Sequence, residues 1–173
     1  PEVSEYLARV QSAAGRIQRQ IEFTRDYTDL GVRSPEWQRI SDAIQTAALH
    51  GLPIDDEAGD LVVYTDPMLS TVFANLMDNT IRHGESATRV RVRYRPEENG
   101  DLTLVWEDDG TGIPAEEKER IFYRGFGKNT GLGLFLIREI LEITGIGITE
   151  TGESGKGARF EMRVPRGGYR LLE

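Results

Sequence analysis

Apolar and small residues recur at alternating steps of three and four positions from Glu2 to Leu30, which predicts one long amphipathic helix. The members of this stripe are Leu7, Val10, Ala14, Ile17, Ile21, Thr24 and Thr28. The stripe is narrow and keeps a seven-residue repeat, as is typical of a helix bundle or a coiled coil. This favours a helix that dimerises with its copy; a helix packed on its own domain is the alternative. Gly31 is a natural helix stop, so we place a domain boundary between residues 1–32 and residues 33–173.

Helix and strand patterns then alternate. Ser34-Pro35-Glu36 has the form of a helix start, and the apolar spacing after it predicts a helix to about Leu49. Leu61–Thr65 is a short apolar run that predicts a strand. Asp66 and Pro67 are expected to cap a helix that runs from Pro67 to about His83. The apolar face of that helix consists of Leu69, Val72, Phe73, Leu76 and Thr80.

The second half of the chain predicts a hairpin followed by further helices and strands. Thr88–Arg95 and Leu102–Glu107 alternate apolar and polar residues, which predicts two strands with one buried face each. Glu98–Asp101 predicts the turn between them. The remaining predicted elements are a helix over Ala115–Arg120, a helix over Leu132–Thr144, and strands over Ile146–Thr149 and Ala158–Val164.

Composition excludes several classes of protein. The chain has 173 residues, of which 38% are hydrophobic and 29% charged, and this suits one compact domain with an appendage. The net charge of −8 makes nucleic acid a poor partner, and the absence of cysteine excludes disulfides and thiolate metal sites. No apolar run is long enough to span a membrane, so we expect no membrane contact by this chain and a cytoplasmic location. A membrane anchor elsewhere in the parent protein stays open.

Candidate chemistry begins with two asparagines, Asn75 and Asn79, on one side of the helix predicted over Pro67–His83. Asparagine is a mediocre helix former, and two of them in register indicate a site. An amide oxygen can complete a magnesium shell while phosphates supply the charge. Arg82 and His83 follow at the end of the helix, where they are placed for phosphate contact. The helix dipole also favours a basic pair there, and for His83 a capping role is an equal alternative.

A second candidate is the stretch Asp108-x-Gly110-x-Gly112-Ile113-Pro114. A carboxylate at the end of a strand, beside backbone without side chains, can accept a hydrogen bond from an amino-purine. A plain strand-to-helix turn is the alternative.

The third candidate is the glycine-rich stretch from Gly125 to Gly133. Glycines this dense before a helix predict a mobile flap that ends in an anion-binding nest at the positive end of the helix dipole. The stretch is not a P-loop, because no glycine-rich loop in the chain ends in Gly-Lys-Ser/Thr.

These motifs, with Gly155-x-Gly157-Ala158-x-Phe160 after them, occur in one order, and from about Pro35 to Pro165 the chain resembles the catalytic and ATP-binding domain of sensor histidine kinases. That domain is part of the GHKL (HATPase_c) superfamily, with DNA gyrase, mismatch-repair MutL and heat-shock chaperone ATPases. The resemblance implies the Bergerat ATP-binding fold, an α/β (α+β) two-layer sandwich. In it, a mixed, mostly antiparallel sheet is covered on one face by helices, here with a protruding N-terminal helix.

The resemblance also implies roles for individual residues. Asn79 matches the magnesium ligand of the asparagine box, and Asp108 matches the carboxylate that accepts from the adenine amino group. Arg82 stands where lysine is usual, and Thr80 where alanine is commoner. Phe122 and Phe126 match the phenylalanine box, and Lys128 is a candidate γ-phosphate contact prompted only by its position in an unusually short flap. The implied ATP-binding residues are Asn75, Asn79, Arg82, His83, Asp108, Gly110, Gly112, Ile113, Phe126, Lys128, Gly131, Leu132, Gly133 and Leu134.

The implied activity is transfer of the γ-phosphate of Mg-ATP to a histidine, for relay to an aspartate of a response-regulator receiver domain. Glu2–Leu30 resembles the second helix of the dimerisation and phosphotransfer domain, through which the full protein would form a homodimer. The only histidines are His50 and His83, and neither suits the acceptor role, so we expect the acceptor on a helix outside this chain. The alternatives are an ATP-hydrolysing GHKL clamp, a serine-directed kinase of the anti-sigma type, and a nucleotide-binding module without catalysis. Hydrolysing relatives carry a catalytic glutamate where this chain has Asn75, which favours the kinase.

Overall fold

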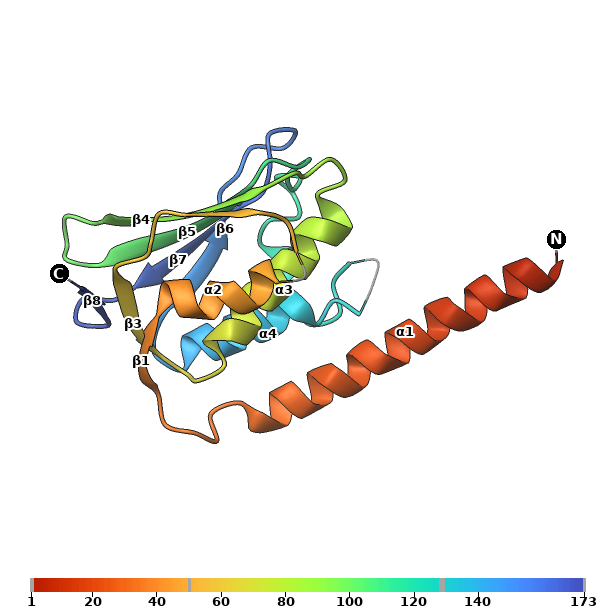
Figure 1. The fold of residues 1–173 in the computed structure, drawn as a ribbon, viewed down its shortest axis with the longest axis horizontal. Helices are drawn as coiled ribbons and strands as arrows, with labels where there is room; N and C mark the ends of the chain where they lie inside the picture. Colours follow the sequence, from red (N-terminus) through yellow and green to blue (C-terminus); the bar gives the residue numbers. More distant parts are fainter. Residues whose placement is uncertain (1, 50, 128–129, 173) are drawn as a thin grey trace.

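The computed structural model describes residues 2–49, 51–127 and 130–172, and Figure 1 shows a body of helices and strands from which one long helix extends. In chain order the elements are α1 (Glu2–Asp29), β1 (Glu36–Arg39), α2 (Ile40–Ala48), β2 (Ile54–Asp56), β3 (Leu61–Thr65), α3 (Leu69–His83), β4 (Val90–Pro96), β5 (Leu102–Asp108), the 3-10 turn η1 (Arg120–Phe122), α4 (Gly133–Glu142), β6 (Gly147–Glu150), β7 (Arg159–Val164) and β8 (Tyr169–Leu171).

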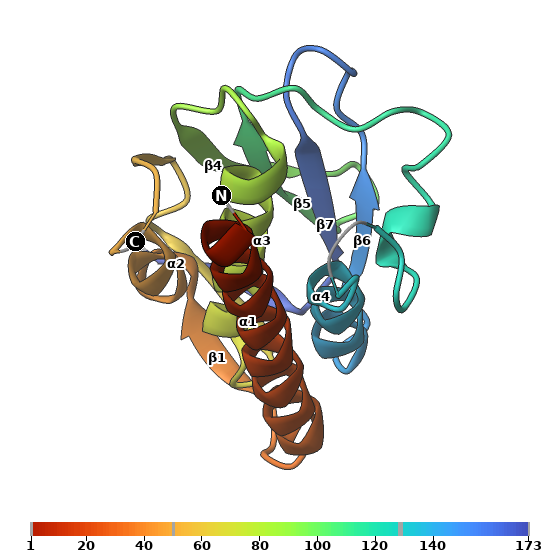
Figure 2. The same ribbon diagram turned by 90° about the vertical axis from the view of Figure 1, so that its right-hand side faces the viewer.

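The body is a two-layer sandwich, as the sequence predicts. Its main sheet has the strand order β2-β4-β5-β7-β6, in which β2 and β4 are parallel and the other neighbours antiparallel. Figure 2 shows α2, α3 and α4 together on one face of this sheet. The core lies between the two layers, where Trp106 of β5 stacks on Phe73 of α3. All five predicted apolar positions of α3 are buried.

The prediction that β5 has only one buried face is wrong. Thr103 and Val105 point away from the helices, yet they are 5% and 1% exposed. Long paired side chains on the neighbouring strands cover them: Arg95 of β4 makes a bidentate ion pair with Glu161 of β7 at 3.2 Å. The aliphatic stems of such residues exclude water while their charged ends stay solvated.

A second, small sheet was not anticipated. The segment predicted to start a helix at Ser34-Pro35-Glu36 instead forms β1, which pairs antiparallel with β3, and the helix begins only at Ile40. On its other edge β3 pairs with β8. Here the pairing of β1 with β3 overrides the local helix-capping signal. The partner strand lies more than twenty residues away, so the local sequence pattern does not reveal this pairing.

Two further boundaries differ from expectation. The helix predicted from Pro67 begins at Leu69, because the Asp66 carboxylate accepts a hydrogen bond from the Met68 N–H (2.9 Å) in a turn before the helix. The helix predicted over Ala115–Arg120 is absent. That stretch is a series of turns leading into η1, which spans only three residues.

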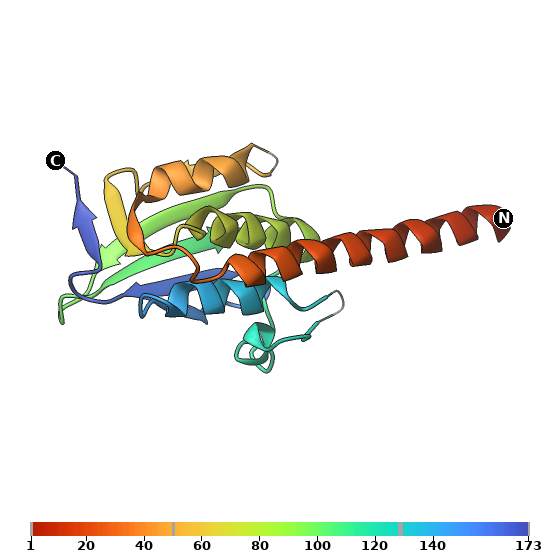
Figure 3. The same ribbon diagram turned by 90° about the horizontal axis from the view of Figure 1, so that it is seen from below.

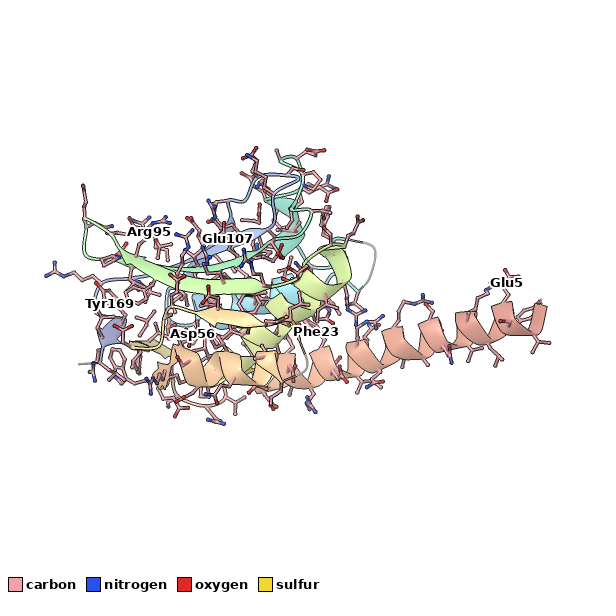
Figure 4. All side chains as sticks on the ribbon, turned by 45° about the horizontal axis from the view of Figure 1, so that its top comes forward. Glu5, Phe23, Asp56, Arg95, Glu107 and Tyr169 are labelled. Carbon is pink, nitrogen blue, oxygen red and sulfur yellow. The ribbon has the colours of Figure 1, made fainter. Side chains whose placement is uncertain are left out.

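Helix α1 has 28 residues and leaves the body with its N-terminus far from every other element (Figures 1 and 3). Near its C-terminal end it packs on α4, where Phe23 and Tyr27 lie 6.3 and 6.2 Å from the ring of Phe135. Figure 4 shows Phe23 beside the body and Glu5 far out on the helix. The interpretation of a helix packed on its own domain therefore holds for this C-terminal end. The apolar stripe toward the N-terminus is exposed, and dimerisation through it stays a prediction. Among the described residues no helix has the length and hydropathy required to cross a bilayer.

Candidate functional site

One side of α3 faces a cleft that is closed on the opposite side by the start of α4. Asn75, Asn79 and His83 occur at steps of four and all three line this cleft, while the other side of α3 is in the core. The Asn75 side chain donates to the Thr71 carbonyl at 2.9 Å, which leaves its amide oxygen turned toward α4. A Cβ at Gly133 would lie 3.1 Å from that oxygen, so a glycine at this position lets the two helices approach.

The N-terminus of α4 forms one end of the cleft and is suited to an anion. Gly131, Leu132, Gly133 and Leu134 all line it, and α4 begins at Gly133. The first backbone N–H groups of a helix have no partner within the helix, and the dipole makes this end positive. Four of the residues predicted to bind ATP therefore lie together at a helix end that favours anions.

A second hollow continues the cleft toward the end of β5. It shares Asn79, His83 and Phe126 with the first hollow and adds Gly112, Ile113 and Pro114 as its wall. The Thr111 hydroxyl donates to the His83 carbonyl at 3.1 Å and fixes this wall to the end of α3. A Cβ at Gly110 would fall 2.5 Å from the carbonyl oxygen of Gly84, so the two backbones cross at glycines.

Asp108 is buried next to the cleft and is 4% exposed. One carboxylate oxygen accepts from the backbone N–H groups of Gly110 and Ala158, each at 3.0 Å. The other accepts from the Thr80 hydroxyl at 2.9 Å, and Thr80 in turn accepts from the Trp106 indole at 3.4 Å. Asp108, Gly110 and Thr80 do not line the two hollows themselves; the Thr80 hydroxyl joins Asp108 to α3, the helix that carries Asn79.

The role of Thr80 as the hydroxyl that positions Asp108 is not visible in the sequence, where Thr80 only completes an apolar stripe. Asp109 is a similar case. Burial pushes its pKa upward, but hydrogen bonds from the Thr88 hydroxyl (2.6 Å), the Thr88 N–H (2.7 Å) and the Arg89 N–H outweigh this and hold the pKa at about 2. Asp109 thereby clamps the loop after α3 against the end of β5.

The two phenylalanines of the flap have different positions. Phe122 is buried and meets Phe160 edge-on at 6.3 Å, so it anchors the base of the flap in the core. Phe126 lines the cleft, with the Arg120 guanidinium 4.9 Å above its ring. Lys128 lies outside the described residues, and its contact with a γ-phosphate stays a prediction.

Two arginines also line the cleft. Arg82, expected to contact phosphate, donates through its Nε to both carboxylate oxygens of Asp78 at 2.8 and 2.7 Å, so much of its charge is already neutralised. Arg19 reaches the same cleft from α1. The sequence did not indicate Arg19, because its place depends on how α1 packs against the body.

The described residues contain no cluster of three or more His, Asp or Glu side chains that could hold a metal ion. Among the side chains that line the cleft, Asn75 and Asn79 offer neutral amide oxygens, and the Asp78 carboxylate is paired with Arg82. Such a site fits a divalent cation that brings its charge balance with it on phosphate oxygens.

Comparison with known proteins agrees with this geometry. Residues 65–168, more than half of the chain, match the family model of the histidine kinase-, DNA gyrase B- and HSP90-like ATPases (HATPase_c). The alginate biosynthesis sensor protein KinB of Pseudomonas aeruginosa is 35% identical over 103 residues, 56% of this chain and 17% of that protein. The sensor protein SrrB of Staphylococcus aureus is 31% identical over 112 residues, 60% of this chain and 19% of that protein. The chain thus spans less than a fifth of these relatives.

Solved structures show the same fold at low identity. A full-length ShkA in complex with AMPPNP has a TM-score of 0.72 at 18% identity, covering 95% of this chain and 39% of that one. The mycobacterial sensor histidine kinase MprB has a TM-score of 0.65 at 21% identity, covering 80% and 99%. The chain belongs to the HATPase_c family, as a catalytic domain of the sensor histidine kinase type preceded by an N-terminal helix.

Proposed function

We propose that the cleft binds Mg-ATP and that the parent protein transfers the γ-phosphate to a histidine, as a two-component sensor kinase. One observation carries the proposal: the face of α3 with Asn75, Asn79 and His83 and the glycine-rich start of α4 line one cleft, beside the buried Asp108. The purine would meet the Asp108 carboxylate, the metal the Asn79 amide, and the phosphates the N-terminus of α4.

The direction of the nucleotide follows from charge. The triphosphate would lie at the N-terminus of α4, where free N–H groups and the helix dipole favour anions. The purine would lie toward Asp108, whose buried carboxylate accepts hydrogen bonds from donors. The wall of Gly112, Ile113 and Pro114 would pack against the base.

Asn79 would hold Mg²⁺ through its amide oxygen, with the other ligands from phosphate and water. When bound, the metal would neutralise charge on the phosphate oxygens. The chain's own residues position the nucleotide: α4 holds the phosphates, and the Asp108–Thr80 pair holds the base. Attack by a histidine nitrogen would form an N–P bond and break the bond from the γ-phosphorus to the bridging oxygen, with ADP as the leaving group.

The wider assignment is also a proposal. Residues 1–32 would be part of the dimerisation and phosphotransfer helices, and residues 33–173 the catalytic domain. The sensor-type relatives support a response-regulator receiver domain as the partner. A homodimer would form through α1, whose N-terminal apolar stripe is exposed, and this domain would be cytoplasmic. His83 lies in the nucleotide cleft, so the acceptor histidine would lie on another helix of the parent protein.

Hydrolysis of ATP is the competing function, and the contacts of Asn75 disfavour it. Asn75 stands where hydrolysing relatives carry a glutamate, and its amide group is held by the Thr71 carbonyl. A carboxamide cannot take a proton from water.

A binding titration followed by a labelling experiment tests the proposal. We expect the chain to bind Mg-ATP, and Asn79→Ala to weaken binding about tenfold and remove its magnesium dependence. Asn99→Ala, in the distant β4–β5 turn, is the matched control and should bind normally. The parent protein should incorporate γ-phosphate into an acid-labile, base-stable phosphohistidine. Release of inorganic phosphate without that label, or a flat titration, would contradict the proposal.

A further inference from the structure

Arg19 is a side chain of the protruding helix that reaches the cleft of the body. It lines the hollow formed by Asn75, Asn79 and Gly131–Leu134. It also lines the groove that continues from there between α1 and the body, together with Phe23. Arg19 is thus the contact between α1 and the phosphate end of the cleft.

The guanidinium of Arg19 makes no ion pair within the described part of the chain, although Glu22, Asp26 and Asp78 line the same groove. Its Nε is buried without a hydrogen-bond partner there. None of the ion pairs among the described residues includes it. By contrast, Arg82 is paired with Asp78, and Arg16, one turn before Arg19, donates to Ser12 on its own helix. A buried donor without a partner is costly, so this one is suited to an acceptor that arrives with a ligand.

The packing of α1 on α4 holds Arg19 at the cleft. It is one turn before Phe23, which is 8% exposed against α4, so both side chains share one face of α1. The guanidinium also lies back along its own helix, because a Cβ at Gly15 would be in ordinary van der Waals contact with Nη1, at 3.4 Å.

We propose that Arg19 binds the terminal phosphate of a nucleoside triphosphate, and that α1 therefore docks on the triphosphate-bound domain more tightly than on the diphosphate-bound one. The inference rests on the proposed ATP binding and adds the contact that senses the third phosphate. Guanidinium matches phosphate geometry, and its hydrogen bonds to an anion are among the strong ones. Linkage makes the effect reciprocal, because whatever tightens triphosphate binding through Arg19 also stabilises the docked helix.

The test compares triphosphate and diphosphate affinities by calorimetry, with Mg-AMPPNP and Mg-ADP as ligands. Arg19→Ala should weaken AMPPNP binding about tenfold, equivalent to about 1.4 kcal/mol, and ADP binding less than twofold. Arg19→Lys should lie between Ala and the parent for AMPPNP. Arg16→Ala removes a charge one turn away and should change neither affinity. Hydrogen exchange of residues 10–29 should slow with AMPPNP in the parent chain and not in Arg19→Ala.

The outcomes separate this inference from the proposed function. If the parent chain binds neither nucleotide, the proposed function fails and this inference fails with it. If the parent binds both, the inference alone is overturned by an unchanged AMPPNP affinity in Arg19→Ala or by an equal loss for ADP. An equal effect of Arg16→Ala would overturn it too, because the effect would then be a general one of charge.

Discussion

The substitution Asp108→Asn separates recognition of the base from stability of the fold. The side chain keeps its shape, and an oxygen can still accept from the N–H groups of Gly110 and Ala158. The group that faces Thr80 becomes an amide donor, which that hydroxyl can accept. The fold should therefore lose only about 1 kcal/mol, the usual net value of one hydrogen bond.

Nucleotide binding should suffer more. A charge-assisted hydrogen bond contributes about 1.5–3 kcal/mol, and in the variant a donor would face the adenine amino group, itself a donor. We expect Mg-ATP to bind at least thirtyfold more weakly, about 2 kcal/mol. Inosine triphosphate carries a carbonyl oxygen in place of that amino group, so its affinity relative to ATP should rise in the variant.

Isothermal titration with both nucleotides, together with thermal unfolding, measures these effects. Asp109→Asn is the matched control, because the neighbouring carboxylate contacts the Thr88 loop instead. A variant that binds ATP as the parent does would refute the role of Asp108. An equal loss for ATP and inosine triphosphate would show that the residue supports the fold and does not read the base.

Three further predictions follow from contacts outside the cleft. Lys118→Met would leave the fully buried Glu150 carboxylate without its counter-charge and should lower the free energy of unfolding by about 3 kcal/mol, measured in urea; an unchanged midpoint would contradict the pairing. The pKa of Asp109 is lowered to about 2, so its contribution to stability is complete above about pH 4 and is lost as the pH falls toward 2. Because that side chain is 38% exposed, the loss should not exceed about 1 kcal/mol, and an acid-unfolding curve of Asp109→Asn should lack it. Phe135→Ala removes the ring that holds α1 and should speed proteolysis within α1, while cleavage within the main sheet stays unchanged.

The parts of the fold that could be predicted are those with strong local patterns. Helices α3 and α4 carry apolar residues at helical spacing, and the hairpin of β4 and β5 carries a turn between two alternating runs. The site motifs were equally local: two asparagines four apart, and glycines at a helix start.

What could not be predicted depends on distant partners. β1 is a strand because β3 lies beside it, and Val105 is buried because paired arginines and glutamates cover it. The contact of Thr80 with Asp108 and the place of Arg19 in the cleft could not be predicted for the same reason. Their environments are created by β5 and by the packing of α1, and no short stretch of sequence contains either.

The position of β3 between β1 and β8 has a practical consequence for where this domain ends. The family match ends at residue 168, one residue before β8 begins. A chain that ended at residue 168 would lack β8, the neighbour of β3 on one side. The backbone N–H and C=O groups of β3 on that side would then be unpaired and could pair with a strand of another molecule. Residues 169–171 therefore complete this side of β3, although they lie beyond the residues that match the family model.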